Sequence, residues 1–219
     1  GLASEQMIFM LYPKEHPYSW PVIGSMADLS AASLEDTREF FRKYYAPNNA
    51  VIAVAGAVKA DEVKALVRKY FADIPRGPAI ERPTAPAFRL ARDTVGVLED
   101  RVQLPRLYYN WHTVKAFAPG DAALDLAAYV LAGAKNSRLT QKLVYDLQLA
   151  TDVVAYQDSK TLDGDFTLWT TARPGKSLPE LQAVVDAELR RLAEEGPSAR
   201  ELEQAKNAFE AGFLNGLER

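Results

Sequence analysis

The chain has 219 residues, 48% of them apolar, and carries 26 Lys and Arg against 29 Asp and Glu, a formal net charge of -3. This length and apolar content suffice for one sizeable core or two modest lobes. Mixed charge argues against a nucleic-acid surface, and no apolar run approaches the roughly 18 to 20 residues of a membrane span. The absence of cysteine excludes disulfides and thiolate metal sites but does not fix the compartment.

Residues 1–12 are predicted to form the end of a helix, and residues 13–30 a connection rich in proline and aromatic side chains. His16 lies in this connection, where it could bind metal or substrate. The favoured interpretation is a packed loop, in which proline fixes φ and the aromatic rings hold the loop to the body. No second His or Cys lies at a ligand spacing from His16.

Residues 33–75 predict a helix, a strand and a second helix. Ser33 and Asp36 match a capping box, and Pro47 ends the first helix. The apolar run at residues 51–55 predicts a short buried strand. Each helix has an apolar stripe, formed in the first by Leu34, Thr37, Phe40, Phe41, Tyr44 and Tyr45 and in the second by Val63, Leu66, Val67, Tyr70 and Phe71.

The composition of residues 77–92, rich in proline, indicates a semi-rigid linker between lobes. We therefore expect residues 1–76 to be the C-terminal part of a first lobe and residues 93–219 to be a second α/β lobe, truncated at its C-terminal end. Because the last helical pattern stops without a cap, we expect the chain to be a fragment of a longer protein.

The second lobe is predicted to open with strands at residues 94–98 and 101–113, with Pro105 marking an edge or bulge. His112, near the end of the second strand, is interpreted as structural or solvent-facing rather than catalytic. Helices are predicted at residues 121–134, 138–147, 179–193 and from Ser198 onward, and strands at 153–156 and 166–172 around an Asp163-Gly164 hairpin signal.

Leu202, Ala205, Phe209 and Phe213 are predicted to form the buried stripe of the last helix. Hairpins occur together with helix pairs. The expected fold class is therefore α+β, with two-layer lobes of mixed or antiparallel sheet and helices on one face.

The sequence contains no H-x-x-E-H or inverted motif, no G-x-S-x-G, no P-loop and no dinucleotide fingerprint. Ser137 and Arg138 could bind an anion at a helix N-terminus, but a cap and a surface charge are the commoner interpretation. We therefore predict no catalytic residue and no metal ligand in this chain, and leave the substrate-binding residues unknown.

Three stretches carry a resemblance to a known family: HPYSWPVIGS at residues 16–25, the unit at residues 33–75, and SRLTQKLVYDLQLA at residues 137–150. In this order and spacing they resemble the pitrilysin-type (insulinase-like) zinc metallopeptidases, in particular the shorter bacterial members related to mitochondrial processing peptidase. The resemblance implies two related α/β lobes of a peptidase half. It also places the zinc ligands and the general base upstream of Gly1, so zinc is expected in the parent protein and none in this fragment.

Non-catalytic partners in this family carry an Arg and a Tyr in the pattern L-R-x-x-x-G-L-x-Y. Here Leu143 is followed by Val144, Gln148 takes the glycine position and Thr151 the tyrosine position. The chain thus resembles the zinc-bearing subunit, and the resemblance implies a paralogous partner that supplies the Arg and Tyr, or a homodimer.

The leading hypothesis is a fragment of a zinc endopeptidase that forms chamber wall and a surface for peptide or unfolded protein, inactive alone. The alternative is a non-catalytic structural or partner subunit of the same superfamily, similar to the core proteins of the respiratory bc1 complex. An unrelated α+β binding domain is a third hypothesis. A periplasmic parent is favoured, and a cytoplasmic one stays open.

Overall fold

The computed structural model describes residues 1–85 and 88–217. It divides into two compact units, one of residues Gly1–Ser19 with Ala85–Arg219 and one of residues Trp20–Thr84. These units differ from the predicted lobes in grouping residues 1–19 with the later part of the chain. The lobe boundaries of the whole protein stay a prediction.

The elements of the first unit are α1 (Leu2–Leu11), β1 (Arg106–Thr113), α5 (Asp121–Ala128), the π-helical segments Tyr129–Gly133 and Thr140–Asp146, β2 (Ala150–Ser159), β3 (Gly164–Ala172), α6 (Leu178–Glu195) and α7 (Ala199–Leu217). The second unit contains α2 (Met26–Ala31), α3 (Leu34–Tyr44), a 3₁₀ turn (Pro47–Asn49) and α4 (Ala60–Phe71).

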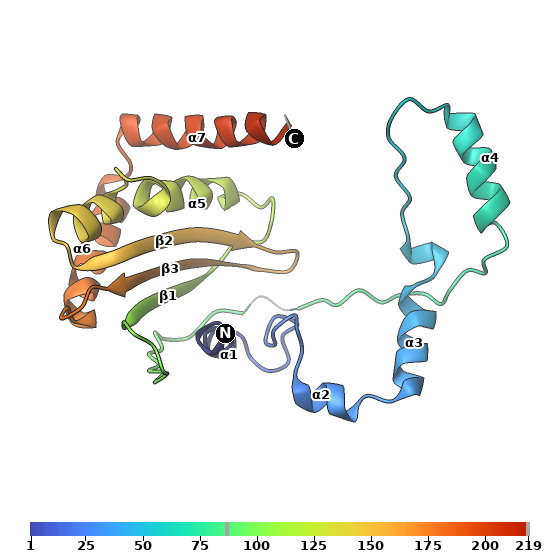
Figure 1. Cartoon of the computed structure of the whole chain (residues 1–219), viewed down its shortest axis with the longest axis horizontal. Helices are drawn as coiled ribbons and strands as arrows, with labels where there is room; N and C mark the ends of the chain where they lie inside the picture. The colour runs from blue at the N-terminus through green and yellow to red at the C-terminus, as the bar shows by residue number, and fades with distance from the viewer. Residues whose placement is uncertain (86–87, 218–219) are drawn as a thin grey trace. The chain divides into compact units, whose positions relative to one another are not determined.

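The first unit is built on a three-stranded antiparallel sheet in the order β1-β3-β2, with α5 and α7 layered on one side in Figure 1. The predicted hairpin at Asp163-Gly164 joins β2 to β3. The fold is thus α+β with an antiparallel sheet, as the sequence predicts.

The core of the first unit lies between one sheet face and the helices. Its largest fully buried side chains are Leu131, Leu139, Leu143, Leu168, Leu181 and Val185. Leu139 and Leu143 come from the SRLTQKLVYDLQLA stretch, which is why that stretch is apolar every fourth residue. Burying each leucine contributes about 1.5–3 kcal/mol to folding.

Leu107 and Tyr109 of β1 pack against this core, together with Leu168 of β3. Alternate residues point to the other sheet face. There the His112 ring reaches the end of α1, so α1 lies against β1 on the side away from the core.

The second unit has almost no interior. Only Ala46 is buried within residues 20–84, and neither α3 nor α4 has a buried residue. Asn48 connects distant parts of this unit, because its side chain accepts from the Gly77 backbone N–H at 2.8 Å and donates to the Pro78 carbonyl at 2.9 Å. A side chain at Gly77 would collide with Ala46, which explains glycine at this position.

The capping box at Ser33 and Asp36 is confirmed. Ser33 accepts from the Asp36 backbone N–H at 3.1 Å, and Asp36 accepts from the Ser33 backbone N–H at 2.8 Å. The hydroxyl and backbone N–H of Ser33 lower the pKa of Asp36. Helix α2, capped by Ser25, was not predicted.

Two predicted strands are wrong for the part of the chain that the structure describes. Residues 51–55 and 94–98 are not paired in any sheet there. A strand exists only where a neighbour accepts its backbone hydrogen bonds, and an apolar pattern alone does not supply that neighbour.

The predicted buried stripe of the last helix is also wrong in part. Ala205 is buried, whereas Phe209 is 47% exposed and Phe213 67% exposed. Phe209 and Phe213 line an open apolar hollow together with Tyr129, so their rings stay largely in contact with solvent. The Phe209 ring lies 6.3 Å from that of Tyr129.

Candidate functional site: a groove along the free edge of β1

A groove of about 1470 Å³ runs beside β1 in the first unit. Its walls are α1, residues 89–98, β1 and α6, with further contributions from Asp100, residues 102–104, β2 and β3. Met7, Met10, Val97, Leu104 and Leu189 belong to its apolar lining. We call it the β1 groove. It combines apolar side chains with one exposed strand edge.

One edge of β1 has no strand beside it among the described residues. On the other edge the Pro105 carbonyl accepts from the Ala172 backbone N–H at 2.9 Å, so odd-numbered residues of β1 face β3. In an antiparallel ladder the even-numbered residues then direct their N–H and C=O groups outward. Arg106, Tyr108 and Asn110 therefore present backbone donors and acceptors to the β1 groove.

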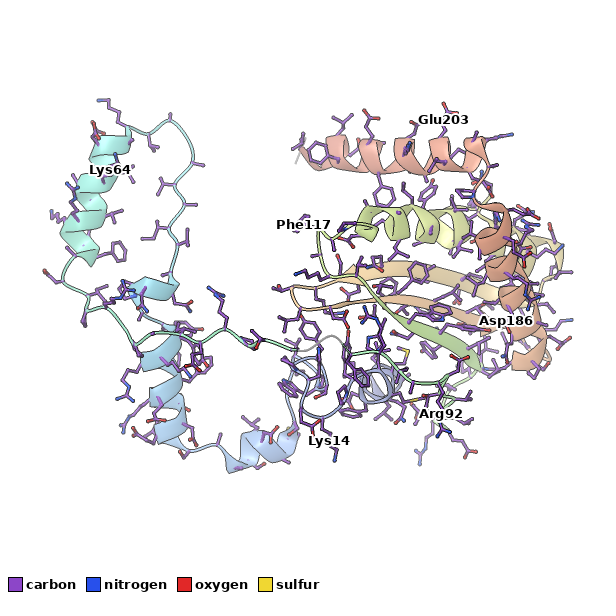
Figure 2. All side chains as sticks on the ribbon, turned by 180° about the vertical axis from the view of Figure 1, so that it is seen from behind. Lys14, Lys64, Arg92, Phe117, Asp186 and Glu203 are labelled. Atoms are coloured by element: carbon purple, nitrogen blue, oxygen red, sulfur yellow. The ribbon has the colours of Figure 1, made fainter. Side chains whose placement is uncertain are left out.

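The core-facing side of the β1 groove is held by Tyr109. Its hydroxyl donates to the Asp186 carboxylate at 2.7 Å, and its ring stacks on Trp111 at 5.3 Å. Burial, together with Asp186, raises the pKa of Tyr109. Figure 2 places Asp186 on α6, so this hydrogen bond fixes α6 against β1.

The other side of the strand carries an ordered cation. Arg106 donates from Nε to the Thr171 hydroxyl at 2.8 Å, and its guanidinium carbon lies 4.2 Å from the centre of the Trp169 ring. A guanidinium over an indole face is attracted by the ring quadrupole. The exposed Arg106 is thus held in place by β3 rather than free in solvent.

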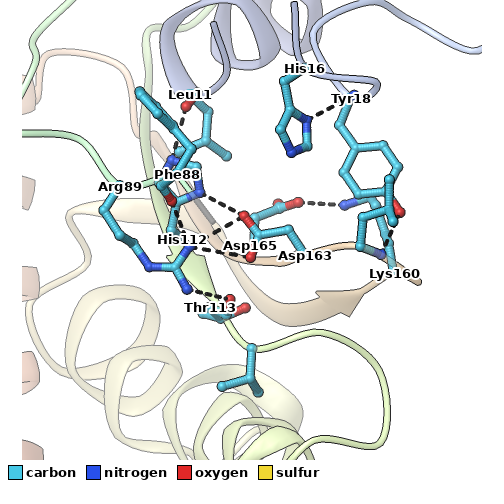
Figure 3. A network of polar contacts seen from close by, with 12 residues as sticks. Leu11, His16, Tyr18, Phe88, Arg89, His112, Thr113, Lys160, Asp163 and Asp165 are labelled. Atoms are coloured by element: carbon cyan, nitrogen blue, oxygen red, sulfur yellow. Dashed lines mark hydrogen bonds and ion pairs between the residues drawn. The ribbon is translucent and has the colours of Figure 1, made fainter. Parts of the chain in front are cut away.

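The predicted candidates His16 and His112 lie in one polar network, which Figure 3 shows. His112 Nδ1 lies 3.1 Å from Asp163 Oδ2, and His112 Nε2 lies 2.9 Å from the Leu11 carbonyl oxygen. Arg89 also contacts Asp163, at 3.3 Å, and donates to the Thr113 carbonyl. The network joins the end of α1 to the hairpin end of the sheet.

His16 contributes through packing. Its Nδ1 accepts from the Tyr18 backbone N–H at 3.0 Å, and its ring stacks on Tyr12 at 4.5 Å. Burial lowers the pKa of His16, with Asp163 acting in the opposite direction. Tyr18 in turn accepts from the Leu162 backbone N–H at 3.0 Å. His16 thus lies in a packed loop, as the sequence interpretation favoured, and both ring nitrogens of His112 contact protein partners.

These residues do not fit a catalytic zinc ion. Such a site needs about three convergent side-chain ligands, whereas both ring nitrogens of His112 already face protein partners. Within residues 1–85 and 88–217 no group of three or more His, Cys, Asp or Glu could hold a metal ion.

Arg138 is engaged by protein rather than poised for an anion. It donates from Nε to Glu201 Oε1 at 2.6 Å and from Nη2 to Glu201 Oε2 at 2.8 Å, and also to the Gly196 carbonyl. Ser137 donates to the Tyr129 carbonyl at 2.7 Å. The Ser137 hydroxyl also accepts from the Ala134 backbone N–H at 2.9 Å, so Ser137 anchors the preceding loop, and Arg138 forms a partly buried ion pair. Neither the side-chain cap nor the surface charge of the sequence interpretation is found.

The three positions of the Arg/Tyr pattern lie in and after the second π-helical segment. Val144 packs against the core, whereas Thr151 lines the β1 groove at a β-bulge of β2. Gln148, at the glycine position, has φ +49°, a left-handed conformation that glycine adopts without strain. The β1 groove itself was missed from sequence, because no motif marks a strand edge.

Comparison with known families decides what the chain is. The family model described as "Peptidase M16 inactive domain" matches residues 31–209. The chain belongs to this family. The M16 family is the pitrilysin family that the sequence motifs resemble, so that resemblance is confirmed.

Curated relatives of this M16 chain are zinc proteases. It is 29% identical over 207 residues to the zinc protease PqqE of Helicobacter pylori, covering 93% of this chain and 46% of the relative. It is 29% identical over 206 residues to an uncharacterised zinc protease of Mycobacterium leprae, again covering 93% and 46%. The chain thus spans about half the length of these relatives.

Solved structures share the fold. A protease from Helicobacter pylori matches with a TM-score of 0.82 and 26% identity, over 97% of this chain and 52% of that one. A peptidase M16 inactive domain from Pseudomonas fluorescens matches with a TM-score of 0.76 and 24% identity, over 95% of this chain and 50% of that one. A chain of Complex III2 from Candida albicans matches with a TM-score of 0.75 and 16% identity, over 98% of this chain and 55% of that one.

Among the described residues no helix is both long and apolar enough to span a bilayer.

Proposed function

We propose that this chain is the non-catalytic, peptide-contacting part of a larger zinc endopeptidase. Zinc and the water-activating residues belong to the rest of the parent protein, and this part supplies chamber wall and the β1 groove. The observation that carries the proposal is the match of residues 31–209 to the M16 inactive domain, in a chain whose relatives are named zinc proteases.

The β1 groove suits an extended peptide. Strand addition gives affinity through backbone hydrogen bonds and specificity through pockets for alternate side chains. Arg106, Tyr108 and Asn110 present the backbone groups, and the apolar lining presents the pockets. The substrate class is therefore peptide or unfolded protein in extended conformation.

The zinc assignment is tested on two proteins side by side, the 219-residue chain and the product of its intact gene. Zinc by mass spectrometry and cleavage of unfolded casein are measured for both. Zinc and cleavage in the intact protein alone support the proposal. Stoichiometric zinc in the 219-residue chain, or no zinc and no cleavage in either, contradicts it.

Peptide contact is tested by fluorescence anisotropy with a labelled peptide of alternating valine and threonine. Tyr108→Pro removes the outward N–H without touching the ladder to β3, whereas Tyr108→Ala removes the side chain and keeps the N–H. We expect Tyr108→Pro to weaken binding about tenfold, or about 1.4 kcal/mol, relative to Tyr108→Ala. Equal binding by both variants would contradict strand addition at β1.

A second candidate is a structural subunit, favoured by the fold shared with a chain of Complex III2. At 16% identity this likeness concerns the fold alone. A parent protein without zinc that co-purifies in stoichiometric amount with a paralogous chain would support it. The peptidase proposal also includes either a paralogous partner or a homodimer. Size-exclusion chromatography of the parent protein purified alone distinguishes these two, because only a homodimer would elute at twice the mass of the parent.

A further inference from the structure

Residues 94–98 have the pattern of a strand but no partner. Their sequence is TVGVL, and Val95 and Val97 are 90% and 88% exposed. Like β1, they line the β1 groove. The β1 groove is therefore lined by two β-prone stretches, residues 94–98 and β1. Among the described residues, neither stretch has a backbone hydrogen-bond partner on the edge that faces the groove.

The faces of the two stretches match. Gly96 already approaches α1, since a side chain there would lie 2.8 Å from the Met10 sulfur. Helix α1 covers the even-numbered face of β1, the face of Tyr108 and His112. If Gly96 faces α1, strand alternation turns Val95 and Val97 toward the opposite face, where Leu107 and Tyr109 lie.

We propose that residues 94–98 pair with the free edge of β1 as an antiparallel strand, with Gly96 opposite Tyr108, and that this strand is the built-in occupant a peptide must displace. In this register Leu98 lies opposite Arg106, and Val97 lies opposite Leu107. Glycine at position 96 leaves the Tyr108 ring and Met10 room to lie side by side. The pairing stands on geometry alone, and the displacement rests on the proposed function.

Closure of this strand covers apolar surface on both sides. Val95 and Val97 leave solvent and come to lie beside Leu107 and Tyr109, which are only partly buried. The outward backbone groups of β1 gain partners as well. An incoming peptide would have to replace these contacts with its own, which restricts binding to segments with alternating apolar side chains.

The absence of native cysteine makes disulfide trapping a clean test of the pairing. The matched pair is Val97→Cys with Leu107→Cys, whose positions are directly opposite and non-hydrogen-bonded in this register, at a Cα spacing of about 4.5 Å that a disulfide spans. The control is Val97→Cys with Tyr108→Cys, whose side chains point to opposite faces.

Intramolecular disulfide formation is followed by mass spectrometry in a mild oxidising buffer. We expect the matched pair to close about tenfold faster than the control pair. Equal rates would mean that residues 94–98 sample the groove without register, and only intermolecular products would mean that they do not reach it. Either result overturns the pairing.

Hydrogen exchange tests the pairing without altering the core residue Leu107. In this register the Leu98 N–H faces β1 and the Val97 N–H faces away. Leu98→Pro should therefore raise exchange at the Arg106 amide about tenfold, and Val97→Pro should leave it unchanged. Equal effects of the two prolines would overturn the register.

Displacement is tested with the labelled valine-threonine peptide on the matched cysteine pair. The oxidised protein should lose binding about tenfold, and reduction should restore it. Unchanged binding after cross-linking overturns the displacement but leaves the pairing intact. Absence of binding in wild type, with the cross-link formed, contradicts the proposed function rather than the pairing.

Discussion

The ion pair between Arg138 and Glu201 offers the sharpest test of how the first unit is held together. The Arg138 side chain is 8% exposed and the Glu201 side chain 27% exposed, and the two side chains make two hydrogen bonds with each other. The Arg138 hydrogen bonds, helped by Ser198, lower the pKa of Glu201 from its usual 4.5 to about 2. Glu201 is also the N3 residue of the capping box that opens α7.

A lowered carboxyl pKa means that the folded state favours the charged form. Lowering the pKa of Glu201 from 4.5 to about 2 corresponds to about 3 kcal/mol of stabilisation at full value, which the partial exposure of Glu201 reduces to about 2 kcal/mol. This stabilisation is fully present above pH 4.5 and is lost as the pH falls toward 2.

We therefore expect Glu201→Gln to lower the free energy of unfolding by about 2 kcal/mol at pH 7, or about 4–8 °C in melting temperature. Glu203→Gln, on the same helix but without a contact to Arg138, is the matched control. Urea unfolding followed by circular dichroism measures both variants. The gap between wild type and Glu201→Gln should narrow as the pH falls from 4.5 toward 2. Equal stability of the two variants at pH 7, or a gap independent of pH, would refute the reasoning.

Four further results are expected. Leu143→Ala, which removes a fully buried side chain, should destabilise the chain by about 2–5 kcal/mol in urea unfolding, and a loss below about 1 kcal/mol would contradict its place in the core. Gln148→Gly should raise the free energy of unfolding by up to about 1 kcal/mol, and with it the melting temperature, because glycine adopts the left-handed backbone without strain. A lower melting temperature would show that the Gln148 side chain has a stabilising role of its own. Tyr109→Phe should cost about 1–2 kcal/mol and leave Asp186 without its donor, so a neutral effect would argue against α6 being fixed there. Excess EDTA should leave the melting temperature unchanged, since no metal-binding cluster occurs in the described part of the chain, and a drop of several degrees would reveal one.

Local signals predicted the local structure well. The capping box at Ser33 depends only on residues three positions apart, and it is present. In the predicted helix at residues 138–147, Leu139 and Leu143 are fully buried, whereas Leu147, the next leucine at the same spacing, is 43% exposed. The Asp163-Gly164 turn predicted the β2–β3 hairpin, because turn chemistry acts over a few residues.

Features that need a distant partner were not predictable in the same way. Residues 51–55 and 94–98 are apolar and β-prone, yet whether they pair depends on which edge lies beside them. His16 and His112 are far apart in the sequence, and nothing in their spacing indicates that both rings contact Tyr12. The β1 groove is likewise a property of three-dimensional arrangement, visible only once α1 and α6 are placed around β1.

The lack of an interior in residues 20–84 has a consequence for handling the isolated chain. Helices α3 and α4 span 11 and 12 residues and bury no side chain, so only local interactions stabilise them. Helices of about this length are marginal in water without tertiary packing. A protease should therefore cut first within residues 20–84 and leave the sheet and its helices intact as a resistant product. Limited digestion before crystallisation would therefore separate the sheet and its helices, which pack around a core of their own, from residues 20–84, whose helices lack tertiary packing.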